Sequence, residues 1–174
     1  MEHLQTYTPY HIHNLETIAI FLESAEIPPP KFEMSSYMEV QDWAKLPEGL
    51  DIVSLSQHGF HYKSTSWAIP EIYKHCGTSA CAVGHGPLAG IPALPGETWV
   101  QYSIRVFGCG QGEGDNEWIN SKDFDFMFGP SWSGLNNTAK GTARRIKYWL
   151  ANGRGDYDPY DEVYPWLEDL SVEA

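Results

Sequence analysis

Hydrophobic residues recur at helical spacing in several parts of the chain, most clearly over residues 138–152. Asn137 or Thr138 can cap the start of this segment, and Gly153 stands just past its end. At about 100° per residue, one face carries a narrow apolar stripe. The stripe consists of Ala139, Ala143, Ile146 and Leu150. The pattern predicts a helix throughout 138–152, with the stripe against the core.

Two further segments show the same spacing and predict helices. In residues 14–25, Asn14 is the expected cap, and the apolar face consists of Leu15, Ile18, Ala19 and Leu22. In residues 97–107, Glu97 stands at the N-terminal end, where the helix dipole favours an acid. Its apolar face consists of Trp99, Tyr102 and Val106. The glycine-rich residues 108–114 end this helix.

The weaker patterns predict smaller features. Residues 115–128 are rich in aromatic side chains and should pack tightly. Residues 50–69 predict a loop or a short hairpin, and residues 40–44 a helical turn. Phe32 and Met34 are expected to insert into the core.

Residues 75–87 read His-Cys-Gly-Thr-Ser-Ala-Cys-Ala-Val-Gly-His-Gly-Pro and are dominated by small side chains. Thr78 or Ser79 can cap a short helix that continues through residues 80–83. Glycine and proline then stop it. Small side chains let neighbouring backbones approach closely, so we place this helix at the centre of the fold and expect Cys81 to be buried.

These patterns predict a mainly α fold: a compact single domain of residues 1–174 around the short small-residue helix, with long loops. The length of 174 residues is normal for one domain, and the 42% hydrophobic content argues against disorder. The C-terminal tail, residues 156–174, carries seven acids and no Lys or Arg. Its apolar residues are expected to anchor it to the body: Tyr157, Tyr160, Tyr164, Trp166 and Leu167.

The charge balance excludes one class of function. The chain has 11 basic and 23 acidic residues, so its net charge is −12. Proteins that bind nucleic acid without sequence preference use a basic surface, so we expect no such binding. The N-terminus lacks a basic segment followed by an apolar run, and no apolar stretch approaches about 18 residues. We therefore expect a cytoplasmic protein with no membrane contact and free cysteines.

The central motif carries a resemblance to a known family. Cys76-Gly-Thr-Ser-Ala-Cys81-Ala-Val-Gly-His85 resembles the Cys-Gly-Thr-x-Ala-Cys-x-x-Gly-Trp/His core of an uncharacterised family of small phage and bacterial proteins. Further parts of the pattern are Phe32-Glu-Met34, Met127-Phe128 with Trp132, and residues 142–146. The likeness covers roughly residues 14–152. It implies a mainly helical fold, no established activity, and the host cytoplasm if the protein is phage-encoded.

The same motif holds four possible zinc ligands, which are His75, Cys76, Cys81 and His85. Its spacing lacks the Cys-x-x-Cys pair of structural zinc sites, so we expect no metal. Further histidines could add ligands, but nothing links them in sequence: His11, His13, His58 and His61. A cysteine enzyme stays open, with Cys76 as nucleophile and His75 or His85 as base. We assign no catalytic residue and no cofactor.

The most suggestive feature for function is a basic row on the predicted C-terminal helix. Residues 140–154 carry five of the 11 basic groups and no acid. Lys140, Arg144 and Lys147 fall on one face, where they could hold a phosphate or another anion. The expected ligand-binding set adds Arg145, His85 and Trp149, and aromatic rings there could stack on a ligand. Alternatively, this row pairs with the acidic tail.

Three classes of function follow. The first is a non-enzymatic binding protein that sequesters a small anionic ligand such as a signalling nucleotide, as phage counter-defence proteins do. The second is a hydrolase that depends on the Cys and His residues of the motif or on a metal. The third is an acidic inhibitor that mimics DNA or covers a basic protein surface. The pattern favours the first, and oligomeric state stays open.

Overall fold

The computed structural model describes residues 2–24, 81–94, 97–110, 119–129, 132 and 138–155, together with four two-residue strands between positions 39 and 79. The expected insertion of Phe32 and Met34 and the acidic tail at 156–174 lie outside the described residues. So do residues 111–118, which include most of the glycine-rich loop.

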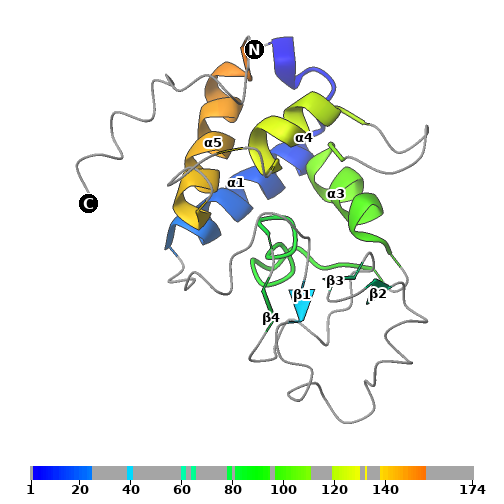
Figure 1. Cartoon of the computed structure of the whole chain (residues 1–174). Helices are drawn as coiled ribbons and strands as arrows, with labels where there is room; N and C mark the ends of the chain where they lie inside the picture. Colours follow the sequence, from blue (N-terminus) through cyan, green and yellow to red (C-terminus); the bar gives the residue numbers. More distant parts are fainter. Residues whose placement is uncertain are drawn as a thin grey trace.

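The described chain is mainly α. A 3₁₀ turn, η1 (Glu2–Leu4), precedes α1 (Pro9–Ser24), and α3 (Trp99–Phe107), α4 (Ser121–Phe128) and α5 (Ala139–Asn152) follow later in the chain. Figure 1 shows the helices gathered together, with the segment between β4 and α3 passing between them and the strands. Helix α1 packs against α5 and α3, and α4 packs against α5. The prediction of a mainly α fold is confirmed.

The strands form a small antiparallel sheet in the order β2-β3-β1-β4. They are β1 (Glu39–Val40), β2 (Phe60–His61), β3 (Ser64–Thr65) and β4 (Thr78–Ser79). Strands β2 and β3 form the short hairpin that was one of the two expectations for residues 50–69. The helical turn expected at 40–44 is wrong at its first residue, because Val40 pairs with Thr78 in the sheet.

Helix α5 agrees with its prediction at both ends. The Thr138 hydroxyl accepts a hydrogen bond from the Gly141 N–H at 3.1 Å, and Gly153 follows the last helical residue. Ala139, Ala143 and Ile146 of the predicted stripe are buried, and Leu150 is partly buried. Local sequence signals were sufficient here because the cap, the stripe and the stop all indicate the same helix.

Helix α1 begins earlier than its hydrophobic pattern indicated. It starts at Pro9, and the predicted cap Asn14 lies inside it. The Asn14 side chain is buried and donates a hydrogen bond to the Val106 carbonyl of α3 at 2.9 Å. The expectation of Asn14 as a cap is therefore wrong, because a tertiary contact uses its amide. The predicted apolar face of α1 is buried as expected.

Helix α3 begins at Trp99 after a capping box. The Thr98 side chain accepts from the Gln101 N–H, and the Gln101 side chain accepts from the Thr98 N–H. Glu97 stands just before this box, where the helix dipole favours its negative charge, and its carboxylate also has two specific partners. Its carboxylate accepts from the Leu94 N–H at 2.9 Å and forms an ion pair with Arg105 at 2.6 Å. These contacts fasten the preceding loop to α3.

The central motif is not a helix. Thr78 and Ser79, the expected caps, form β4, and residues 82–90 follow as successive turns. The turns mix hydrogen-bond spacings: His85 N–H to the Cys81 carbonyl, Gly86 N–H to Val83, and Ile91 N–H to Gly86. Mixed spacing of this kind cannot propagate as an α-helix. The prediction of a central small-residue helix is therefore wrong, although the predicted burial of Cys81 is confirmed at 4% exposure.

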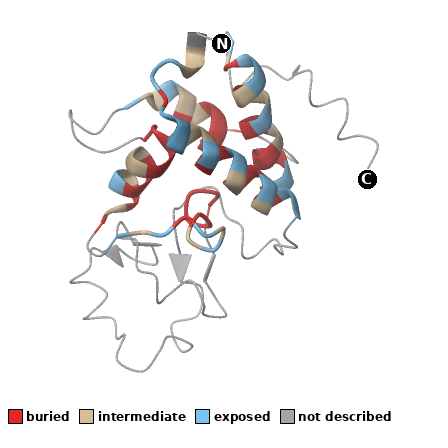
Figure 2. Cartoon of the chain, turned by 180° about the vertical axis from the view of Figure 1, so that it is seen from behind, coloured by how far each residue is buried: buried red, intermediate tan, exposed pale blue. Residues whose placement is uncertain are grey.

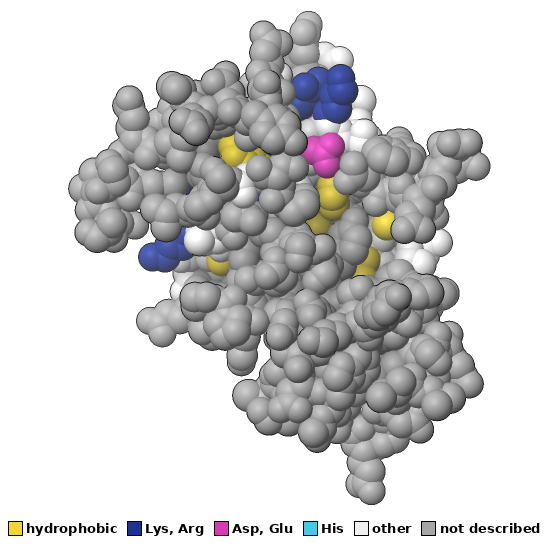
Figure 3. Space-filling model, viewed as in Figure 1, with side chains coloured by type: hydrophobic (Ala, Val, Ile, Leu, Met, Phe, Trp, Pro, Cys, Tyr) yellow, Lys and Arg dark blue, Asp and Glu magenta, His cyan; other side chains and the backbone are white. Residues whose placement is uncertain are grey.

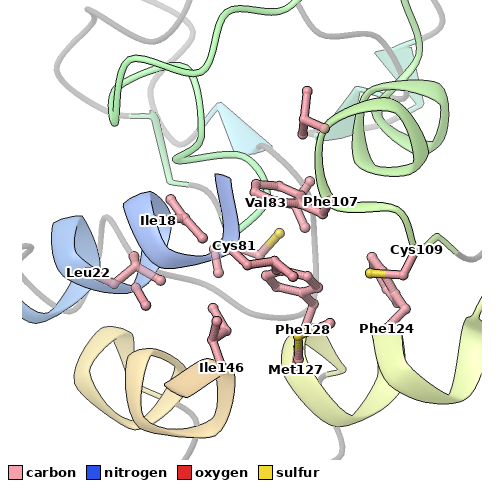
Figure 4. Packing of buried hydrophobic residues seen from close by; sticks show 14 of the residues in the cluster. Ile18, Leu22, Cys81, Val83, Phe107, Cys109, Phe124, Met127, Phe128 and Ile146 are labelled. Carbon is pink, nitrogen blue, oxygen red and sulfur yellow. The ribbon is translucent and has the colours of Figure 1, made fainter. Parts of the chain in front are cut away.

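The motif is nevertheless a structural centre. Figure 4 shows Cys81 and Val83 among side chains from α1, α3, α4 and α5, including Ile18, Phe107 and Ile146. Figure 2 shows that its first turns are buried like the inner faces of the helices. Gly86 is needed for this packing, because a Cβ there would lie 2.2 Å from the Tyr102 hydroxyl. That hydroxyl donates to the Ile91 carbonyl at 2.7 Å.

The aromatic-rich segment forms α4 and packs tightly, as expected. Phe124, Phe126, Met127 and Phe128 are all buried. The Phe107 and Phe128 rings lie 5.3 Å apart, which joins α3 to α4. The Trp132 indole N–H donates to the Phe126 carbonyl at 3.0 Å and thereby holds the chain after α4 against that helix.

Candidate functional site

The basic row of α5 lies on the side of the helix that is not packed into the core. Lys140 and Lys147 are exposed, and Arg144 is partly buried. The Lys147 ammonium forms an ion pair with the Glu23 carboxylate at 2.5 Å, which joins α5 to the end of α1. Both side chains are about half exposed, at 44% and 50%, so the pair contributes little to stability. Solvent can reach both groups.

Arg145, which the sequence also suggested for the ligand site, has a structural place instead. It is fully buried, and its guanidinium donates to the Met127 carbonyl and to the Thr142 hydroxyl, both at 3.1 Å. The guanidinium also lies 4.9 Å from the centre of the Trp132 ring. Arg145 therefore joins α5 to the carbonyl end of α4, away from the exposed row. Sequence periodicity alone could have separated it from Arg144, since neighbouring positions point about 100° apart.

Trp149 is fully buried and is not available to stack on a ligand at the surface. Its ring forms edge contacts with His3 at 5.3 Å and with Tyr7 at 4.7 Å. Tyr148 is partly buried, with its ring 6.2 Å from that of Phe126. The aromatic residues beside the basic row therefore belong mainly to the packing between helices.

His85 lies in the central motif, between the Cys81 carbonyl and the Phe21 ring of α1. It is buried, with Nδ1 2.8 Å from the Cys81 carbonyl and its ring 6.4 Å from that of Phe21. The structure therefore brings Lys140, Arg144 and Lys147 together on one face and does not add Arg145, Trp149 or His85 to that face.

The hypotheses of a metal site and of a cysteine enzyme stay predictions. Two of the residues on which they depend, His75 and Cys76, lie outside the described residues. Within the ranges that the structure describes, no group of three His, Cys, Asp or Glu side chains is arranged to hold a metal ion. Cys109 is buried, and burial is the largest cause that raises the pKa of its thiol well above the usual value. A protonated thiol is a poor nucleophile, so Cys109 is not a candidate for catalysis.

A second polar cluster joins residues that are far apart in sequence, and the sequence analysis missed it. The Tyr7 hydroxyl donates to Asp123 Oδ2 at 2.9 Å, and the other carboxylate oxygen lies 3.4 Å from Nε of Arg154. Burial, with the neighbouring Cys109 and Asp123, raises the pKa of Tyr7, so the phenol stays protonated. No local signal identifies this cluster, because Tyr7 and Asp123 are 116 positions apart.

On the face seen in Figure 3, the charged side chains of the described residues do not form one continuous basic surface. In the view of Figure 3, the visible Lys and Arg side chains form separate groups, and an acidic side chain lies near one of them.

Comparisons with known protein families, characterised proteins and solved structures found no match for this chain. Among the described helices, none is both long enough and apolar enough to cross a membrane.

Proposed function

We propose that this protein is a non-enzymatic binding protein that sequesters a small anionic ligand, such as a signalling nucleotide, on the basic face of α5. The basic face consists of Lys140, Arg144 and Lys147. The observation that carries the proposal is that these three cations share the outer face of a well-capped helix that contains no acid. In a chain of net charge −12, such a local concentration of positive charge attracts anions that the rest of the surface repels.

Each side chain has a separate role in the proposal. Arg144 is partly buried, with its Nη1 atom enclosed by the protein, and in the proposal its other guanidinium N–H groups donate to the phosphate. Lys140 and Lys147 add exposed charge on either side. The ion pair with Glu23 positions the Lys147 ammonium. Because both side chains are about half exposed, an incoming anion can still reach this ammonium. Arg145, Trp149 and His85 are not part of this binding face.

A biological role follows from the resemblance given above. In a phage-encoded protein, capture of a host signalling nucleotide would serve counter-defence without any catalytic step. We propose this role together with the ligand class, and neither requires a metal or a cofactor.

The proposal is tested by measuring ligand binding to a charge-reversal variant. Inorganic phosphate, ATP and cyclic mono- and dinucleotides are screened by thermal shift and then by calorimetry. A ligand at 100 times its dissociation constant stabilises the folded protein by about 2.7 kcal/mol. We expect Arg144→Glu to abolish this shift, which is measured against the melting temperature of the unliganded variant.

The matched control is Lys122→Glu, which makes the same charge change at an exposed position on α4. This variant should bind like the parent, because α4 is not part of the basic face. Equal weakening by both variants would show that net charge alone governs binding and would contradict a site on α5. If no probe binds and Arg144→Glu only makes residues 156–173 more sensitive to limited proteolysis, the row pairs with the tail and the binding proposal is wrong.

A further inference from the structure

His11 occupies an unusual position at the start of α1. Thr8 precedes the helix, and its carbonyl accepts the Ile12 N–H at 3.1 Å, which marks it as the N-cap residue. The Thr8 hydroxyl accepts from the His11 N–H, and the Thr8 N–H donates to His11 Nδ1, both at 3.3 Å. This reciprocal pair is a capping box in which histidine replaces the usual Glu or Gln.

Only a neutral imidazole can complete this box. Nδ1 accepts the Thr8 N–H, so it must carry no proton, and the proton of the neutral ring then lies on Nε2. The ring also forms a hydrogen bond with the backbone of Arg105 near the end of α3, where a ring N–H can donate to the carbonyl. His11 therefore lies between the start of α1, where Nδ1 accepts from Thr8, and the backbone at the end of α3.

The backbone of α3 approaches the ring closely at Gly108. This glycine has φ +73°, and a Cβ there would lie 2.6 Å from His11 Nδ1. Any other residue would both strain the backbone and displace the imidazole. The ring therefore fits in one place, with little room to turn away from Thr8 when it gains a proton.

Other titratable and charged groups face His11 from its own helix and from α3 and α4. The Tyr7 and Tyr10 rings contact the imidazole, each at 6.2 Å between centroids. Burial raises the pKa of Tyr7, whose hydroxyl donates a hydrogen bond to Asp123 of α4. On α3, the hydrogen bond to Glu97 raises the pKa of Arg105, whose guanidinium stays charged and faces the Tyr10 hydroxyl. Cys109, beside Tyr7, keeps its proton because burial raises the pKa of its thiol.

We propose that His11 is an acid-sensitive latch: a proton on Nδ1 breaks the capping box with Thr8 and releases residues 2–8 from the helices. This segment covers the end of α5, because the Tyr7 and His3 rings pack against Trp149. Opening of the latch therefore uncovers a tryptophan that is fully buried when the latch is closed.

The direction of the pH effect follows from three causes. Burial, the largest, lowers the pKa of His11 from its ordinary value of 6.5, and the hydrogen bond to the Arg105 backbone opposes this. A cation in the first turn of α1 is also unfavourable at the positive end of the helix dipole. Because the folded pKa lies below the unfolded one, the latch is fully stabilising above pH 6.5 and weakens as the pH falls through the folded value.

Hydrogen exchange of residues 2–12, corrected for intrinsic rates, tests the latch at pH 7.5 and pH 5.0. In the parent protein, protection of this segment should fall on acidification, by up to about tenfold for each unit by which the pKa is lowered. In His11→Gln, the amide oxygen can accept from Thr8 without titrating, so protection should become independent of pH. Protection that falls equally in the parent and in His11→Gln would overturn the proposal.

Two control variants separate His11 from the other histidines near the N-terminus. His13 is exposed on the same helix, and His3 packs on Trp149. His13→Gln and His3→Gln should each keep the pH dependence of the parent, and its loss in either would assign the effect to that residue and overturn the latch. If His11→Gln fails to fold, an NMR titration of the parent decides: a His11 midpoint at or above that of the urea-unfolded chain would also overturn the proposal, and a lower midpoint supports it.

Discussion

Helix α5 and residues 81–90 are both rich in small apolar side chains, yet only α5 is helical. Helix α5 has a hydroxyl cap at Thr138, an apolar stripe at helical spacing and a glycine just past its end. Residues 81–90 contain Gly84, Gly86, Pro87 and Gly90, and the strand β4 precedes them. Both segments contribute buried side chains to the core, among them Ala143 and Ile146 of α5 and Cys81, Ala82 and Val83.

The comparison shows that small apolar side chains predict burial more reliably than they predict helix. Each glycine in a helix interior is unfavourable by roughly 1 kcal/mol relative to alanine, and proline lacks the N–H that the helix needs. Residues 81–90 therefore satisfy their backbone through turns, and their close approach to Tyr102 depends on Gly86. The next three predictions change one segment or the other, from the largest effect to the smallest.

Replacing Ile146 with Ala should destabilise the protein most. The side chain is fully buried between α5 and the rest of the core, so its loss leaves a cavity. We expect a loss of about 2–5 kcal/mol in the free energy of unfolding, measured by urea denaturation. Leu150→Ala, at the partly buried end of the same stripe, is the control and should lose less. Equal losses would show that the stripe does not set the packing of α5.

Replacing Cys81 with Leu tests the packing of residues 81–90. The thiol is 4% exposed and lies among side chains from several helices, so a larger side chain has no space. We expect destabilisation by about 1–3 kcal/mol through overpacking. Leu88→Ala changes an exposed residue of the same turns, at 47% exposure, and should have almost no effect. A Cys81→Leu variant as stable as the parent would contradict the central position of this segment.

Replacing Thr138 with Ala removes the cap that α5 has and that residues 81–90 lack. The hydroxyl accepts the Gly141 N–H, which would otherwise lose its partner. We expect a loss of about 1 kcal/mol in thermal or urea unfolding, and Thr138→Asn should restore most of it. Ser24→Ala is the control. The Ser24 hydroxyl lies at the C-terminal end of α1, donates to the Phe21 carbonyl and caps no helix N-terminus. A loss no larger than in this control would mean that α5 does not depend on its cap.

The candidate site was predictable only in part. The exposed row of Lys140, Arg144 and Lys147 follows from helical periodicity, which places the three residues on one face, about 100° around the helix from the apolar stripe. Periodicity does not predict that Arg145 donates to the Met127 carbonyl or that the Trp149 ring contacts His3. These contacts depend on how the helices pack against one another. The cluster of Tyr7, Asp123 and Arg154 was missed for the same reason.

By itself, the sequence determined the mainly α class, the ends of α5 and the inner faces of α1 and α3, since caps, stops and hydrophobic spacing act over a few residues. Tertiary structure decided the use of Asn14, whose buried amide bonds the Val106 carbonyl of α3 instead of capping α1. The capping box of Thr8 with His11, which begins the helix five residues earlier, is a local signal outside the hydrophobic pattern. Tertiary structure also decided that Thr78 and Ser79 pair in a sheet. Asn14 had both a local role as a cap and a distant partner in α3 available, and its burial favoured the distant one, because a buried polar group without a partner is costly.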